Sequence, residues 1–78
     1  MAELILSIIK EGLPIVDKLV PDEASKIRAR VSAYLKEWDE EMAKGPLMDD
    51  SKLGALNREL LDIGNLYAGA LKQAATKN

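Results

Sequence analysis

The acidic side chains that could bind a divalent cation fall into two groups along the 78-residue chain. Glu37 and Glu41 are four residues apart, so a helix would place both on one face, while the two acidic residues between them would point elsewhere. Glu59 and Asp62 are three residues apart and resemble a fragment of a helical-bundle metal site. Such sites need further carboxylates and usually a histidine, and the chain has no histidine. We therefore expect solvated faces or salt bridges here and no metal ion.

Three basic residues form the candidate anion contact: Lys26, Arg28 and Arg30. They could meet phosphates or an anionic membrane surface, but their spacing spreads them around a helix. The chain has eleven basic and thirteen acidic residues and a net charge of −2, whereas nucleic-acid binders normally show a basic excess. Nucleic-acid binding is therefore a secondary alternative.

Enzymatic chemistry has little support in the composition. The chain lacks cysteine as well as histidine, and it has no glycine-rich phosphate-binding loop. We predict a non-enzymatic protein with no catalytic residues and no cofactor.

A heptad pattern indicates which elements must position these side chains. Between Leu53 and Ala74 the apolar residues alternate at spacings of three and four, which is typical of a helix that packs against another helix. A matching pattern runs from Ala24 to Trp38 and closes with Met42. Gly45 is a candidate left-handed C-cap, Pro46 prevents continuation, and Asp49, Asp50 or Ser51 is expected to cap the next helix.

These signals predict helices over about residues 22–44 and 50–75, joined by a short loop into a long antiparallel hairpin. With the loop as pivot, Trp38 would face Leu56 and Ala24 would face Ala70. Oppositely charged residues on the two helices would form cross-helix pairs that help to set the register. The alanine-rich end is thin, so we expect the N-terminal segment to fill it.

The N-terminal segment, about residues 2–20, reads as an amphipathic helix that is kinked or broken near Gly12 and Pro14. Glu3, Lys10 and Glu11 interrupt its apolar run, so neither a signal peptide nor a membrane span is predicted. The fold expected for residues 1–78 is one all-α domain, a small helical bundle built on the hairpin.

More apolar surface is present than one hairpin interface can bury. Gly64 and Gly69 suggest close approach by another helix to the outer side of the third helix. We predict homo-oligomerisation, most simply as a dimer, or binding of a host protein. The expected partner or self-association surface comprises Leu4, Ile5, Ile8, Ile9, Leu61, Leu66 and Leu71.

A local resemblance concerns the run Leu13-Pro14-Ile15-Val16-Asp17-Lys18-Leu19-Val20-Pro21-Asp22-Glu23-Ala24, continuing to Arg28-Ala29. This quarter of the chain is similar to small bacteriophage proteins, in particular the soluble N-terminal segment of a three-transmembrane phage holin family. The transmembrane part of that family does not follow in this sequence, so holin activity is not carried over. The resemblance implies a phage or prophage origin.

The function expected from the sequence is a helical protein-interaction module that acts in the cytoplasm, the host cytoplasm if the protein is viral. One alternative is a peripheral membrane protein, resembling a lysis accessory, whose amphipathic N-terminal helix lies in the lipid interface. The other alternative is a nucleic-acid-binding helical protein.

Overall fold

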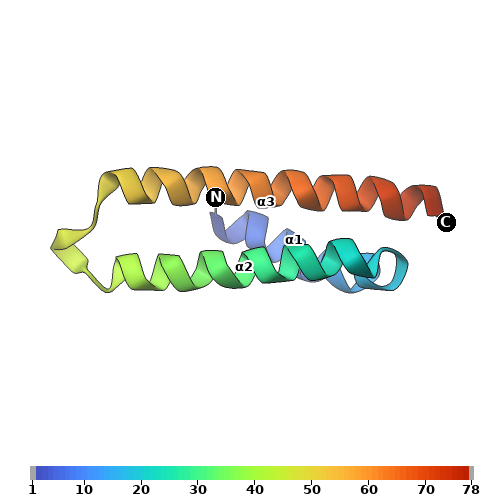
Figure 1. Cartoon of the computed structure of the whole chain (residues 1–78), viewed down its shortest axis with the longest axis horizontal. Coiled ribbons are helices and arrows are strands. Elements are labelled where there is room, and N and C mark those ends of the chain that lie inside the picture. The colour runs from blue at the N-terminus through green and yellow to red at the C-terminus, as the bar shows by residue number, and fades with distance from the viewer. Residues whose placement is uncertain (1, 78) are drawn as a thin grey trace.

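The computed structural model describes residues 2–77, and the side-chain surroundings of residues 3–76. These residues form α1 (Ala2–Leu19), α2 (Pro21–Met42), the short 3₁₀-helix η1 (Gly45–Leu47) and α3 (Asp50–Lys77). Figure 1 shows α2 and α3 as a long antiparallel hairpin with α1 alongside, and α1 contacts both. The predicted all-α bundle built on a helical hairpin is confirmed.

The joint between α1 and α2 is a single residue. Val20 has non-helical backbone angles (φ −139°, ψ 70°) and its side chain is buried. Pro21 then occupies the first turn of α2, where its missing N–H costs nothing because that N–H would have no intrahelical partner. The helix begins one residue earlier than predicted and ends at Met42 instead of about residue 44.

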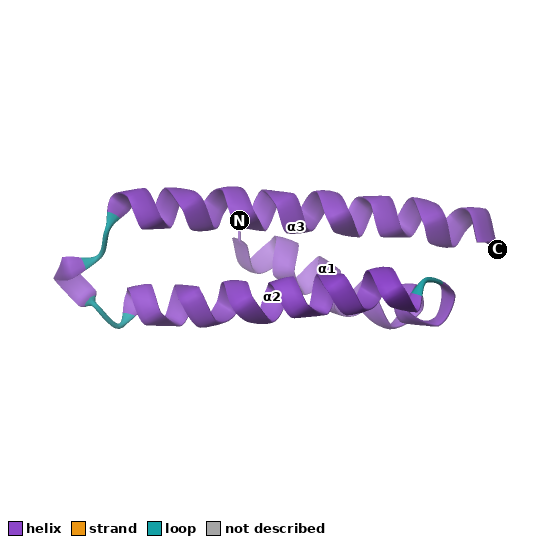
Figure 2. Cartoon of the chain, in the orientation of Figure 1, coloured by secondary structure: helices purple, strands orange, loops and turns teal. Residues whose placement is uncertain are grey.

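The turn between α2 and α3 contains a short helical segment between two loops (Figure 2), and its residues follow the predicted local chemistry. Gly45 adopts a φ of +59°, the left-handed conformation that glycine tolerates best. Residues 45–47, expected as plain loop, form η1. Asp49 caps α3, because its Oδ1 accepts a hydrogen bond from the Ser51 N–H at 2.9 Å.

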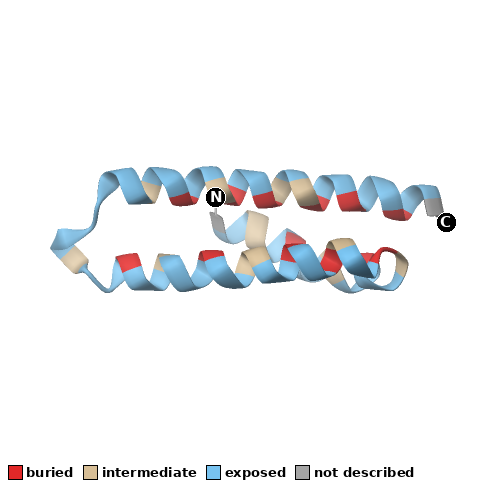
Figure 3. Ribbon diagram, in the orientation of Figure 1, coloured by how far each residue is buried: buried red, intermediate tan, exposed pale blue. Residues whose placement is uncertain are grey.

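A single core cluster draws on all three helices, and its residues line the inner faces of the ribbons in Figure 3. From α2 it takes Ala24, Ile27 and Tyr34, while Val31 and Trp38 are half-buried and Met42 is exposed. From α3 it takes Leu56, Leu60, Ile63, Tyr67, Ala70 and Ala74. Ile9 and Val16 of α1 and the joint residue Val20 complete the cluster.

Gly12 and Pro14 do not interrupt α1. The chain stays helical from Ala2 to Leu19. Of the kink or break predicted near Gly12 and Pro14, the break therefore does not occur. Gly12 has a different role, since a Cβ atom built there would overlap the Tyr67 hydroxyl of α3. Its missing side chain lets Tyr67 reach the α1 backbone, where the hydroxyl donates a hydrogen bond to the Ile8 carbonyl at 3.3 Å.

No helix in the described part of this chain approaches Gly64 or Gly69 closely, so the approach predicted there stays a prediction for a second molecule. A Cβ atom at either position would meet no atom within 4 Å. The glycine that a neighbouring helix needs is Gly12, because α1 packs its backbone against an α3 side chain.

Within residues 2–77, no helix is both long enough and apolar enough to cross a membrane.

Candidate functional site

The seven residues of the predicted partner surface divide into three classes of exposure. Leu4, Ile8, Leu61 and Leu71 are exposed, as the prediction requires. The side chains of Ile5 and Leu66 are half-buried against the core. Ile9 is only 2% exposed, so it belongs to the core and is removed from the surface.

The hydrogen bond between Tyr67 and Ile8 sets the level at which α1 lies beside α3. Both helices run in the same direction along the long axis (Figure 1). Leu4 precedes Ile8 by about one turn, and Leu61 precedes Tyr67 by under two turns. Toward the other end, Ile15 lies two turns after Ile8 and Leu71 about one turn after Tyr67. The exposed leucines and isoleucines of the two helices therefore lie at similar levels.

The position of Leu61 and Leu71 on α3 can be inferred from the residues on the opposite flank of that helix, which face α2. Glu59 pairs with Arg30 of α2, and Leu66 lines a recess together with Glu23 and Arg30 of α2. With 3.6 residues per turn, Leu61 and Leu71 lie on the other side of the core seam, away from α2. The predicted grouping of Leu66 with them is therefore wrong.

The resulting surface combines adjacent flanks of α1 and α3, and we call it the outer apolar face. Its five large side chains are all more than 40% exposed. They are Leu4, Ile8, Ile15, Leu61 and Leu71. Ile15 was missing from the predicted site, although its spacing of seven residues from Ile8 places both on one side of a helix.

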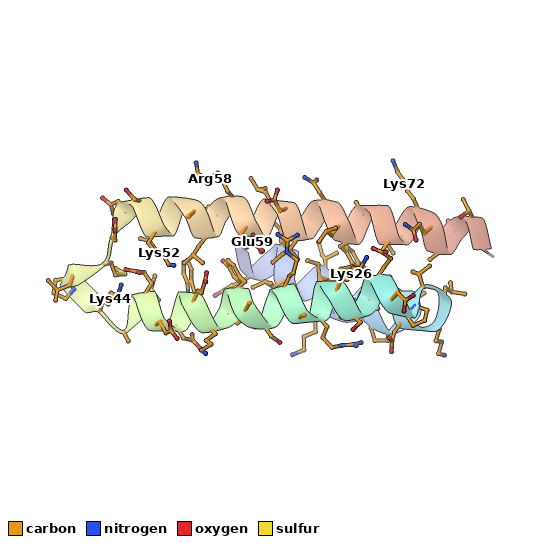
Figure 4. All side chains as sticks on the ribbon, in the orientation of Figure 1. Lys26, Lys44, Lys52, Arg58, Glu59 and Lys72 are labelled. Carbon is orange, nitrogen blue, oxygen red and sulfur yellow. The ribbon has the colours of Figure 1, made fainter. Side chains whose placement is uncertain are left out.

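Each of the three cations of the candidate anion contact has a carboxylate neighbour. Lys26 Nζ lies 3.5 Å from Oε1 of Glu23 in the same helix. Arg28 Nη2 lies 3.6 Å from Oδ2 of Asp17 in α1, and Arg30 Nη2 lies 2.8 Å from Oε1 of Glu59 in α3. Figure 4 shows Lys26 and Glu59 on their separate helices. The three cations face different neighbours, so they do not form one anion-binding patch.

Arg30 and Glu59 also supply the predicted cross-helix pairing. The Arg30 guanidinium donates twice to Glu59 Oε1, at 3.0 Å from Nε and 2.8 Å from Nη2. Both side chains are about one-third exposed, so the pair acts mainly on register and contributes ~0–1 kcal/mol to stability.

Glu41 was expected on a solvated face and is instead buried, with 1% of its surface exposed. Its Oε1 accepts a hydrogen bond from Lys44 Nζ at 3.1 Å and its Oε2 accepts one from the Asp49 N–H at 2.9 Å. The Asp49 hydrogen bond, followed by the Lys44 hydrogen bond, lowers the pKa of Glu41, while burial acts in the opposite direction. The carboxylate therefore ties the end of α2 to the start of α3.

No group of three or more acidic side chains within the described part of the chain could hold a metal ion. Glu41, whose pKa is lowered, accepts hydrogen bonds from Lys44 and Asp49 within the turn between α2 and α3. Among residues 3–76 the outer apolar face is therefore the strongest candidate for a functional surface.

Comparison with protein-family models, with curated proteins and with solved structures gives no match to this chain.

Proposed function

We propose that the protein is a non-enzymatic self-association module in which two copies pair through the outer apolar face. The observation that supports this most directly is the exposure of five large apolar side chains on α1 and α3, which helix geometry places on adjacent flanks of the two helices. Single exposed apolar residues are common, but several on neighbouring flanks are typical of an interaction surface.

The shape of the face favours a helical partner. Its side chains follow two helices that run side by side, and the small residues Gly64 and Ala68 lie between Leu61 and Leu71 on the same flank. A second copy offers the same ridges and hollows, and a two-fold contact needs only this one surface. Burying it would also stabilise a domain that is small for a single core.

The proposal includes a cytoplasmic setting and, from the resemblance of residues 13–29 alone, a phage or prophage origin. A host protein with a similar apolar helix could occupy the same face in place of the second copy. Neither the setting nor the host partner is needed for the central test.

Light scattering coupled to gel filtration tests the proposal on the wild-type chain and on the double variant Ile8→Lys and Leu61→Lys. We expect a dimer for the wild type and a monomer for the double variant, because two lysines on each copy would face each other within the interface. The control is Leu47→Lys, since Leu47 is 81% exposed in the turn and lies outside the face. This variant should dimerise as the wild type does.

A wild-type chain that stays monomeric at high concentration would contradict the proposal. So would dimerisation of the double variant with unchanged affinity. Vesicle co-sedimentation addresses the membrane alternative: a monomeric wild type that binds vesicles, with loss of binding only in the double variant, would assign the outer apolar face to a lipid surface.

A further inference from the structure

A groove of about 400 Å³ lies between α1 and α2, on a different side of the molecule from the outer apolar face. Because α1 and α2 meet at Val20 and run antiparallel, Leu13 lies near the level of Arg28, and Leu6 near the level of Leu35. Seven residues of helix separate Leu6 from Leu13, so the groove extends for about 10 Å. This volume falls in the ~300–1,000 Å³ range of small-molecule sites.

The floor and lower walls of the groove are apolar. Ile9 is buried, and Leu6, Leu13 and Val31 are half-buried, so their side chains are held in place by the core. Leu35 extends the apolar wall and is 43% exposed. An unbranched hydrocarbon chain would bury apolar surface along this floor without disturbing the core.

The ionisable residues that line the groove are both cations. Lys10 stands on the α1 wall and Arg28 on the α2 wall, and the hydroxyls of Ser7 and Ser32 complete the polar rim. Within residues 2–77, Lys10 has no salt-bridge partner. Arg28 lies 3.6 Å from Asp17, and both side chains are about half exposed, so this pair is weak and easily rearranged.

Two cations beside an apolar floor, with no acidic residue among the lining side chains, complement one kind of ligand. The two positive charges favour an anionic group, and the apolar floor favours a hydrocarbon chain. Arg28 lies toward the α1–α2 joint and Lys10 near the middle of the groove, whereas Leu6 and Leu35 lie at the far end. This arrangement gives the ligand a direction.

We propose that this groove binds a free medium-chain fatty acid. The carboxylate lies between Lys10 and Arg28, and the chain runs along Ile9 and Val31 toward Leu6 and Leu35. Seven residues of helix, about 10 Å, separate Arg28 from Leu35, which is close to the length of an extended chain of about eight to ten carbons. The proposal is independent of self-association, because it uses none of the five residues of the outer apolar face.

Isothermal titration calorimetry with three probes of equal chain length tests the assignment. Decanoate should bind at least about tenfold more tightly than decanol, and decyltrimethylammonium should bind least, because the two cations attract the carboxylate and repel the ammonium. Equal affinity for decanoate and decanol, or no binding of decanoate, would overturn the proposal.

Variants locate the site. Lys10→Met and Arg28→Met keep a chain of similar length but remove the charge, so each should weaken decanoate binding by about tenfold and leave decanol unchanged. Lys72→Met, on α3, is the matched control and should bind decanoate as the wild type does. An equal loss of decanoate affinity in all three variants would show a non-specific effect of net charge and would contradict binding in this groove.

Amide chemical shifts provide the second readout and do not depend on any substitution. Decanoate should shift the backbone amides near Leu6, Val31 and Leu35 and leave those around the outer apolar face unaffected. Shifts centred on Leu61 and Leu71 would place the probe on the other face. Binding of the chain to phosphatidylglycerol vesicles with no effect of added decanoate would assign the two cations to a membrane surface and would likewise reject the proposal.

Discussion

Gly12 controls how closely α1 and α3 pack. Sequence alone presents it as a weak point of the N-terminal helix, since glycine costs up to ~1 kcal/mol relative to alanine within a helix. In the fold, its missing Cβ leaves room for the Tyr67 hydroxyl, which bonds to the Ile8 carbonyl. The helical cost of glycine is therefore offset by a contact between two helices.

We expect Gly12→Ala to destabilise the fold by ~1–3 kcal/mol, because the added methyl group would force the Tyr67 ring away from α1. Urea unfolding followed by circular dichroism measures the change in the free energy of unfolding. The opposite sign is expected for Gly69→Ala, which should stabilise by up to ~1 kcal/mol since no atom lies within 4 Å of the new methyl group. Equal effects of the two substitutions would contradict this account of Gly12.

The turn between α2 and α3 depends on Glu41, at the scale of the secondary-structure elements. Glu41 is buried near the end of α2, and its carboxylate holds Lys44 and the Asp49 backbone N–H. Asp49 in turn caps α3 through Ser51. The end of one helix and the start of the next are thus connected by consecutive hydrogen bonds.

The lowered pKa of Glu41 gives the turn a pH dependence of known sign. A carboxyl group whose pKa is lower in the folded than in the unfolded state stabilises the fold when the pH is above the ordinary pKa of that group, which is 4.5 for Glu41. That contribution is lost as the pH falls below 4.5 through the pKa of the folded state. At neutral pH it is fully present.

Glu41→Gln should lower the Tm by a few degrees at pH 7, because the amide can still accept from Asp49 but carries no charge for Lys44. The difference in Tm between wild type and variant should shrink as the pH falls below about 4.5. Circular dichroism melts across this pH range measure it. Glu40→Gln is the control, since Glu40 is exposed; a pH-dependent difference of the same size in that variant would show that Glu41 is not the source.

At the scale of the whole molecule, three helices share one core along an elongated body of 49 × 18 × 15 Å. A body this narrow has a large surface for its volume, and the core uses only one side of each helix. Apolar residues outside the core therefore stay exposed at the outer apolar face, and also along the groove between α1 and α2. Dimerisation would add a second buried layer to the small core.

If the outer apolar face pairs two copies, the Tm must rise with protein concentration, because association favours the folded state by mass action. Melts over an about hundredfold range of concentration should show this rise for the wild type and for Leu47→Lys. In the variant carrying both Ile8→Lys and Leu61→Lys the Tm should be independent of concentration. A wild-type Tm that does not change with concentration would count against a dimer.

The sequence predicted most of what depends on local chemistry. The three helices, the left-handed Gly45 and the Asp49 cap all follow from residues within one or two turns of each other. The heptad seams also named the α3 core from Leu56 to Ala74, since apolar periodicity records which side of a helix is buried.

The candidate surfaces could be predicted only in part. Leu4, Ile8, Leu61 and Leu71 were named from the excess of apolar residues, and all four are exposed. Ile9 and Leu66 were misplaced because a wide apolar stripe does not say which of its edges meets the other helices. Ile15 was missed for the same reason.

What the sequence by itself determined is therefore the set of helices and their inner seams, because these follow from backbone sterics, capping and the period of the helix. Only the tertiary structure decided the roles of Gly12 and Glu41 and the two surfaces that α1 leaves on its flanks. Gly12 meets Tyr67 across 55 positions of the chain, and Arg28 joins Lys10 from another helix. The physical reason is that a helix face acquires its partners only when another helix packs at a particular angle and level.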